Sequence, residues 1–263
     1  MIEWIEKRLQ ELVPYQDETI FKAARYSLLS PGKRIRPRLV LATTESLGAD
    51  PKLALDPACA LEMVHTYSLI HDDLPCMDDD DLRRGKPTLH KVYGEDIATL
   101  TGDYLLTYAF QVIVAAEALS AEQKLALVES LARYAGAPGL ISGQVTDLES
   151  KEKPLDEATL QKMHIHKTGA LLTAALEFGR IIAGKHIDAF VDLGASIGLY
   201  YQIRDDLEDA TQENTPKATA VSLLGTTKAK ETLFQLQQSI HRCMHNLRLQ
   251  NSPLFTLIGQ ILD

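Results

Sequence analysis

The chain has 263 residues, of which 45% are hydrophobic and 24% are charged, and its formal net charge at neutral pH is −9. This balance is typical of a folded globular protein with a sizeable core and excludes the disordered and fibrous classes. The negative charge repels phosphate backbones, so we expect no nucleic-acid partner. We expect a single domain over residues 1–263.

The cysteines and the N-terminal residues bear on the cellular compartment. The three cysteines are odd in number and form no Cys-x-x-Cys pair, which argues against a disulfide framework and a thiolate zinc site. Residues 1–8 mix acidic and basic side chains where a signal peptide has an apolar core, and no uninterrupted apolar run reaches membrane-spanning length. We therefore expect a cytoplasmic protein that is not integral to a membrane.

Apolar residues recur at helical spacing along most of the chain, as at Leu55, Ala58 and Leu61, and sustained two-residue alternation is absent. Segments with proline or glycine divide this pattern at 30–32, 47–51, 136–139 and 153–156. The pattern predicts an all-α fold of about ten or more helices. It includes long helices over 58–74 and 187–209.

Two short basic segments stand out in this acidic chain. Residues 33–38 read Lys-Arg-Ile-Arg-Pro-Arg, and residues 83–86 read Arg-Arg-Gly-Lys. Both are too short to follow a nucleic-acid duplex, but they suit a small anion. A solvated helix start is the alternative for the first segment.

The first acidic cluster covers residues 72–81, of which six are aspartate. These carboxylates repel one another, and a solvated loop is the common explanation for such a run. Here, however, apolar Leu69 and Ile70 precede the cluster and basic residues follow it. Pro75 is expected to end the preceding helix, so that Asp72 and Asp78 do not share one helix face.

The second acidic cluster lies at the end of the predicted helix over 187–209. Asp205 and Asp209 fall about 40° apart on a helix of about 3.6 residues per turn, and so share a face. Carboxylates at this spacing suit a hard divalent cation, although exposed acidic helix ends are also common.

The combination of two carboxylate clusters and two basic segments is more specific than any one of them. Diphosphate groups require both neutralising cations and direct charge-assisted donors. The chain has no G-x-x-x-x-G-K-[ST] loop, which argues against a P-loop nucleotide hydrolase, and no Ser-His-Asp or Cys-His arrangement stands out.

Four segments carry a family resemblance: GKRIRP at 32–37, HTYSLIHDDLPCMDDDDLRRGKPTLH at 65–90, HKTGAL at 166–171 and YQIRDDLED at 201–209. With these, the chain resembles the isoprenyl diphosphate synthases, most closely the short-chain bacterial farnesyl diphosphate synthases. The resemblance implies a homodimer of helical subunits, each with a central active-site cavity. The implied reaction condenses isopentenyl diphosphate with dimethylallyl or geranyl diphosphate to give farnesyl diphosphate.

The same resemblance assigns the residues around the allylic diphosphate. Asp72, Asp78 and Asp205 would bind three magnesium ions that assist ionisation of this diphosphate. Arg83 and Lys167 would contact the same leaving group. The oxygen dipoles of Lys167, Thr168 and Gln202 would stabilise the allylic cation, and no general base is required because the released diphosphate accepts the proton.

The resemblance also implies a metal-free pocket for isopentenyl diphosphate. Its residues are Lys33, Arg36, His65 and Arg84. His65 and Asp72 would lie within about 20° and about 10 Å of each other along one helix, which is compatible with neighbouring sites. A core histidine is the alternative for His65.

Three further histidine and tyrosine positions complete these expectations. Tyr67 matches the bulky residue at the pocket floor that limits product length, and a core aromatic is the alternative. His164 and His166 have no assigned role and are expected to be surface or structural residues.

The chain also departs from the family. After the second acidic motif, the family's lysine-containing loop is missing, with Lys217-Ala218-Thr219 as the candidate match for its end, and the sequence ends at Asp263 without a basic tail. A slower enzyme, a non-catalytic subunit and a sequence with omitted residues all fit these departures. A terpene cyclase is a further alternative. We favour catalysis because both acidic motifs and both basic segments are present.

Overall fold

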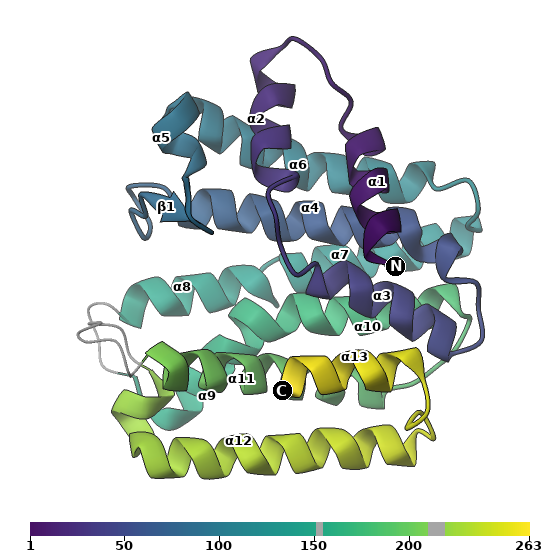
Figure 1. The fold of residues 1–263 in the computed structure, drawn as a ribbon, viewed down its shortest axis with the longest axis vertical. Coiled ribbons are helices and arrows are strands. Elements are labelled where there is room, and N and C mark those ends of the chain that lie inside the picture. Colours follow the sequence, from purple (N-terminus) through teal and green to yellow (C-terminus); the bar gives the residue numbers. More distant parts are fainter. Residues whose placement is uncertain (151–154, 210–218) are drawn as a thin grey trace.

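The computed structural model describes residues 1–150, 155–209 and 219–263, and in this part of the chain it forms thirteen α-helices. The predicted all-α fold is confirmed. The helices of the first half are α1 (Ile2–Leu12), α2 (Thr19–Leu28), α3 (Ile35–Ser46), α4 (Leu55–Asp72), α5 (Leu89–Tyr93), α6 (Glu95–Ala115) and α7 (Ala121–Ala135). Those of the second half are α8 (Leu140–Ser150), α9 (Glu157–His164), α10 (Ala170–Ile182), α11 (Ala189–Asp209), α12 (Ala220–Asn246) and α13 (Pro253–Leu262). Figure 1 shows α2 and α6 toward one end of the long axis and α12 at the other.

Helix α4 carries the first acidic cluster at its C-terminal end. Its residues from Pro57 to Val64 are all buried, and it packs against α3 and α6, as expected for a helix that is apolar on all sides. The helix ends at Asp72, and Asp73 is its C-cap. Pro75 follows, so the predicted break before this proline is confirmed.

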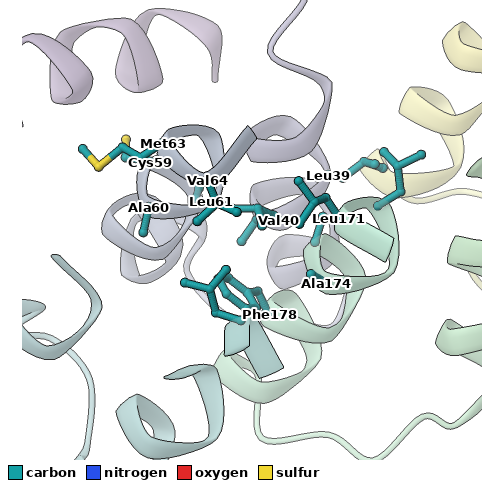
Figure 2. Close-up of a cluster of buried hydrophobic side chains, with 14 of the residues drawn as sticks. Leu39, Val40, Cys59, Ala60, Leu61, Met63, Val64, Leu171, Ala174 and Phe178 are labelled. Atoms are coloured by element: carbon teal, nitrogen blue, oxygen red, sulfur yellow. The ribbon is translucent and has the colours of Figure 1, made fainter. Parts of the chain in front are cut away.

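The main core forms where α3, α4 and α10 meet (Figure 2). Leu39 and Val40 of α3 face Leu61 and Val64 of α4, with Phe178 of α10 beside them. Burying one such side chain contributes about 1.5–3 kcal/mol. The same cluster of buried apolar residues extends from α1 to α13.

A hairpin that the sequence pattern did not indicate follows the first acidic cluster and contains the second basic segment. Strands β1 (Leu82–Arg83) and β2 (Lys86–Pro87) pair antiparallel. Arg84 and Gly85 join them with φ values of 55° and 75°, which is the pattern of a type I′ turn. Strands of two residues are too short to show alternation in the sequence.

Helix α11 carries the second acidic cluster and matches the long helix predicted over 187–209. Its Leu199 and Ile203 belong to a second, smaller core together with α9 residues Leu160 and Met163. A π-helical turn, Ile165–Gly169, connects α9 to α10 and packs against both α8 and α11. Such turns occur frequently at functional sites.

Candidate active site

A cavity of about 890 Å³ opens between the N-terminal end of α3, the C-terminal half of α4, the hairpin, α8, the π-helical turn and α11. Eleven of the twelve residues predicted for the site line it. They are Lys33, Arg36, His65, Tyr67, Asp72, Arg83, Arg84, Lys167, Thr168, Gln202 and Asp205. The remaining one, Asp78, is not among the lining residues, and its backbone N–H donates to the carbonyl oxygen of Asp72 at 3.0 Å.

Asp72 lies at the cavity wall with its carboxylate held by two neighbours. Gln144 Nε2 donates to one oxygen, and Lys167 Nζ lies 3.5 Å from the other. Burial raises the pKa of Asp72, and the Lys167 ammonium opposes this shift. The charged carboxylate is therefore maintained at a cost in free energy, which suggests a role other than stability.

Three of the other aspartates of the first cluster are paired with basic side chains, which reduces the mutual repulsion expected from the sequence. Arg83 donates from Nε to the buried Asp73 at 2.9 Å and from Nη2 to Asp80 at 2.9 Å. Lys91 Nζ lies 2.7 Å from Asp81. Arg83, expected to contact a diphosphate, thus reaches the cavity wall already oriented by two carboxylates.

The second cluster supplies Asp205 to the same cavity. Burial raises the pKa of Asp205 to about 6, and Arg204 opposes the shift. Burial also raises the pKa of Asp206 to about 6, but this residue points elsewhere, because its Oδ2 accepts the N–H of Ala220 at 2.7 Å. The two adjacent aspartates therefore differ in environment: Asp205 lines the cavity, and Asp206 binds the first N–H of α12.

Within residues 1–150, 155–209 and 219–263, no group of three histidine, cysteine, aspartate or glutamate side chains is close enough to hold a metal ion. This arrangement still fits magnesium, because Mg²⁺ usually takes one or two carboxylates together with waters and substrate phosphates. Asp72 and Asp205 offer hard oxygen donors to one cavity. The donor set therefore suits a magnesium ion that arrives with a diphosphate.

The π-helical turn positions Lys167 and Thr168. Its backbone packs closely against two glycines. A Cβ on Gly143 of α8 would lie 2.2 Å from Lys167 N, and one on Gly198 of α11 would lie 2.3 Å from Gly169 Cα. Thr168 Oγ1 donates to Gln202 Oε1 across the gap to α11. These two dipoles are therefore fixed by each other as well as by the close packing.

Two residues of α8 contribute to the site but carry no signal that singles them out in the sequence. Gln144 binds Asp72, and Asp147, which is buried, accepts from Lys167 Nζ at 2.5 Å. They are three residues apart and so share a helix face. This spacing is the one signal that the sequence offers for them. Recognising their role required knowing that this face meets α4 and the π-helical turn.

His164 and His166 lie on either side of the start of this turn. His164 is buried, its Nδ1 has no hydrogen-bond partner in the described part of the chain, and burial lowers its pKa to about 4. His166 is half-buried. His164 is therefore a structural residue rather than a surface one.

The predicted metal-free pocket lies around the start of α3. Arg84 Nη1 donates to the carbonyl of Pro31 at 3.1 Å, and Gly32 lies so close that a Cβ would be 2.5 Å from this nitrogen. Arg36 Nε is buried, and none of the residues that the structure describes forms a hydrogen bond with it. Burial and the guanidinium charges of Arg36 and Arg84 lower the pKa of His65 well below its usual value, so its imidazole is neutral at pH 7.

Tyr67 is one α4 turn before His71 and is 5% exposed. Its ring meets the His71 ring edge-on at 5.7 Å, and His71 Nε2 lies 3.0 Å from the Thr99 carbonyl oxygen of α6. Tyr67 is therefore both a core aromatic and part of the cavity wall. Of the candidate Lys217-Ala218-Thr219 match, the first two residues lie outside the described residues, and Thr219 is the N-cap of α12.

We expect Gly143→Ala to displace Lys167. The added methyl group collides with backbone rather than with a flexible side chain, and overpacking of this kind costs about 1–3 kcal/mol. Thermal melting should show a lower Tm, and steady-state assays a lower kcat. Gly259→Ala in α13 is the matched control, because nothing lies within 4 Å of its added Cβ. Equal Tm and kcat in the two variants would show that close packing of Gly143 against the π-helical turn is unimportant.

Comparisons with known proteins show which family the chain belongs to. The polyprenyl synthetase family model matches residues 17–222. The chain is 44% identical to a farnesyl diphosphate synthase of Geobacillus stearothermophilus, over 89% of this chain and 84% of that protein. It is 40% identical to geranylgeranyl pyrophosphate synthase 7 of Arabidopsis thaliana, over 92% of this chain and 75% of that protein. A Helicobacter pylori geranyltransferase solved with magnesium and isoprenyl diphosphate superposes with a TM-score of 0.88 at 32% identity, covering 99% of this chain and 93% of that one. The chain belongs to the polyprenyl synthetase family of prenyltransferases.

Proposed function

We propose that this protein joins isopentenyl diphosphate to dimethylallyl or geranyl diphosphate and releases diphosphate, with farnesyl diphosphate as the product. The observation that carries the proposal is that one cavity is lined both by carboxylates from two helix ends, Asp72 and Asp205, and by the basic residues Lys33, Arg36 and Arg84. Two diphosphates with different requirements for metal would fit these two regions.

In the proposed reaction, the allylic carbon–oxygen bond breaks, a carbon–carbon bond forms to isopentenyl diphosphate, and a proton leaves the adduct. Asp72, Asp78 and Asp205 would hold the magnesium ions, three by family resemblance. Bound magnesium supplies charge neutralisation of the departing diphosphate. Lys167 and Arg83 would bind the same group, and Thr168 and Gln202 would direct fixed dipoles at the allylic carbon.

A sharp test is incubation of the pure protein with magnesium, isopentenyl diphosphate and geranyl diphosphate, followed by identification of the products. Farnesyl diphosphate supports the proposal. A cyclic hydrocarbon from one substrate would indicate a terpene cyclase, and no turnover would indicate a non-catalytic subunit. The Arg36, His65 and Arg84 lining favours the synthase over the cyclase, because a cyclase has no second diphosphate to bind.

Product length is a separate part of the proposal, because relatives that make farnesyl and geranylgeranyl products have similar identity to this chain. Tyr67 supports the shorter product. It is a bulky, nearly buried side chain in the cavity wall five residues before Asp72. A chain growing past this point meets the phenol ring.

We further propose a cytoplasmic homodimer that forms through α6. This helix is long and apolar enough to cross a membrane by length and composition alone, with 39% of that window buried. Leu100 and Val114 are 56% and 58% exposed and, together with Thr107, recur at seven-residue spacing on one face. A second subunit would cover this face without any lipid.

Sedimentation should give a mass of twice 29.1 kDa. The Leu100→Glu/Val114→Glu double variant should sediment as a monomer, because two buried carboxylates would oppose association. Phe234→Glu is the control, since Phe234 is 62% exposed on α12 at the opposite end of the molecule (Figure 1). A dimer that survives the double variant would rule out α6 as its interface.

A further inference from the structure

The structure gives different environments to two basic residues that are two positions apart in the sequence, Arg34 and Arg36. Arg34 is the N-cap of α3, with φ at 47°, and is 3% exposed. Its Nε donates to Glu6 at 2.7 Å, its Nη1 to Glu62 at 2.9 Å, and its Nη2 to the carbonyls of Leu28 and Ser30 at 2.9 Å each. All three nitrogens are engaged, so Arg34 has no nitrogen without a protein partner to offer to a ligand.

Arg36, two residues later, has the opposite environment. Both residues line the cavity, but the buried Nε of Arg36 has no hydrogen-bond partner among the described residues. Burial lowers the pKa of Arg36, and the Glu62 carboxylate is the strongest influence opposing that shift, while Arg84 adds to it. Within the described part of the chain, Arg36 therefore has an unpaired buried N–H, and Glu62 is the carboxylate that most stabilises its charge.

That carboxylate, Glu62, belongs to α4, lines the same cavity and is 2% exposed. Its ion pair with Arg34 is fully buried, with both side chains at most 3% exposed. A buried carboxylate that loses its cation is strongly destabilised, so it attracts another cation if one is near. If Glu62 lost Arg34, that other cation would be Arg36.

We propose that Glu62 competes with the diphosphate ligand for Arg36, the cation of the metal-free pocket. Arg34 is a positioning residue that keeps Glu62 paired. With Glu62 paired to Arg34, Arg36 remains available to a diphosphate that carries no metal. This inference rests on the proposed function, because it takes isopentenyl diphosphate as that ligand.

The test is calorimetric titration of isopentenyl diphosphate into the protein without magnesium and without allylic substrate. We expect Arg34→Met to weaken binding by about tenfold or more, which corresponds to about 1.4 kcal/mol. The Arg34→Met/Glu62→Met double variant should recover an affinity within about threefold of wild type, because replacing both partners of a buried pair removes the competitor and leaves no unpaired charge.

A control variant addresses the mechanical alternative, that Arg34 matters only because it joins α1 to α4. Arg8 joins the same two helices, with Nε 2.6 Å from Asp56 Oδ1, but does not contact Glu62. Arg8→Met should leave the affinity for isopentenyl diphosphate unchanged. In steady state, Arg34→Met should raise the KM for isopentenyl diphosphate while leaving the KM for the allylic substrate unchanged.

The inference would be overturned if the double variant binds as weakly as Arg34→Met, or if Arg8→Met loses as much affinity. Binding by the wild-type protein would still preserve the proposed function in either case. Absence of wild-type binding would overturn both. If Arg34→Met fails to fold, Glu62→Gln decides: affinity at or above wild type supports competition, and a tenfold loss overturns it.

Discussion

Replacement of Asp72 by asparagine should lower kcat by about three orders of magnitude, equivalent to about 4 kcal/mol of transition-state stabilisation. The substitution removes an anionic oxygen donor from the cavity but leaves an oxygen that can accept the hydrogen bond from Gln144. Burial raises the pKa of Asp72, so the ionised carboxylate is itself destabilising. The Tm should therefore stay near wild type or rise while activity is lost.

Asp205→Asn should show the same loss of kcat, and Asp206→Asn provides a neighbouring control. Asp206 accepts the N–H of Ala220 and does not line the cavity, so its replacement should affect the Tm more than kcat. Steady-state kinetics across a magnesium titration, together with thermal melting, would measure both effects. Near-normal turnover in Asp72→Asn or Asp205→Asn would argue strongly against metal-assisted ionisation at this site.

Tyr67→Ala should shift the product from farnesyl toward geranylgeranyl diphosphate. The ring of Tyr67 lines the cavity, and its loss extends the space available to a growing chain. Chromatography of dephosphorylated products, with radiolabelled isopentenyl diphosphate, would measure the shift.

Tyr200→Ala is the matched control for this variant. Tyr200 is 4% exposed and donates from its hydroxyl to the Leu262 carbonyl at 2.5 Å, but it does not line the cavity. Its removal creates a void of similar size, with a stability cost of about 3–5 kcal/mol and no effect on product length. An unchanged product profile in an active Tyr67→Ala enzyme would leave Tyr67 as a core aromatic only.

Helix positions could be predicted from the sequence because apolar spacing and proline placement act locally. Pro75 ends α4 near the predicted position, and α11 covers Ala189–Asp209 within the predicted range of 187–209. The type I′ hairpin could not be predicted, because Arg84 adopts a positive φ that is uncommon for arginine, and the neighbouring strands are too short for a pattern.

The candidate site was predictable to the extent that its residues lie in recognisable motifs. Gln144 and Asp147 were missed because their importance arises from tertiary contacts with Asp72 and Lys167. Arg34 shows the reverse limit, since it lies within a motif yet turns into the protein interior. Composition counts charges, but only the backbone path determines which of them face the cavity.

The left-handed residues of this fold have a consequence for engineering thermostability. Non-glycine residues with positive φ carry a conformational cost of about 1–3 kcal/mol, so a stability screen would favour glycine at such positions. Arg248 follows α12 and lies in a Schellman motif, in which Leu249 N donates to Met244 O at 2.9 Å. Glycine at Arg248 would gain this conformational free energy without a change in the cavity. At Arg84 the same exchange would remove an arginine from the anion pocket, so it would trade substrate affinity for heat resistance. At Arg34 it would also leave the buried Glu62 without its cation, so the conformational gain would be lost. Selection for heat resistance alone would therefore act against the anion pocket at Arg84.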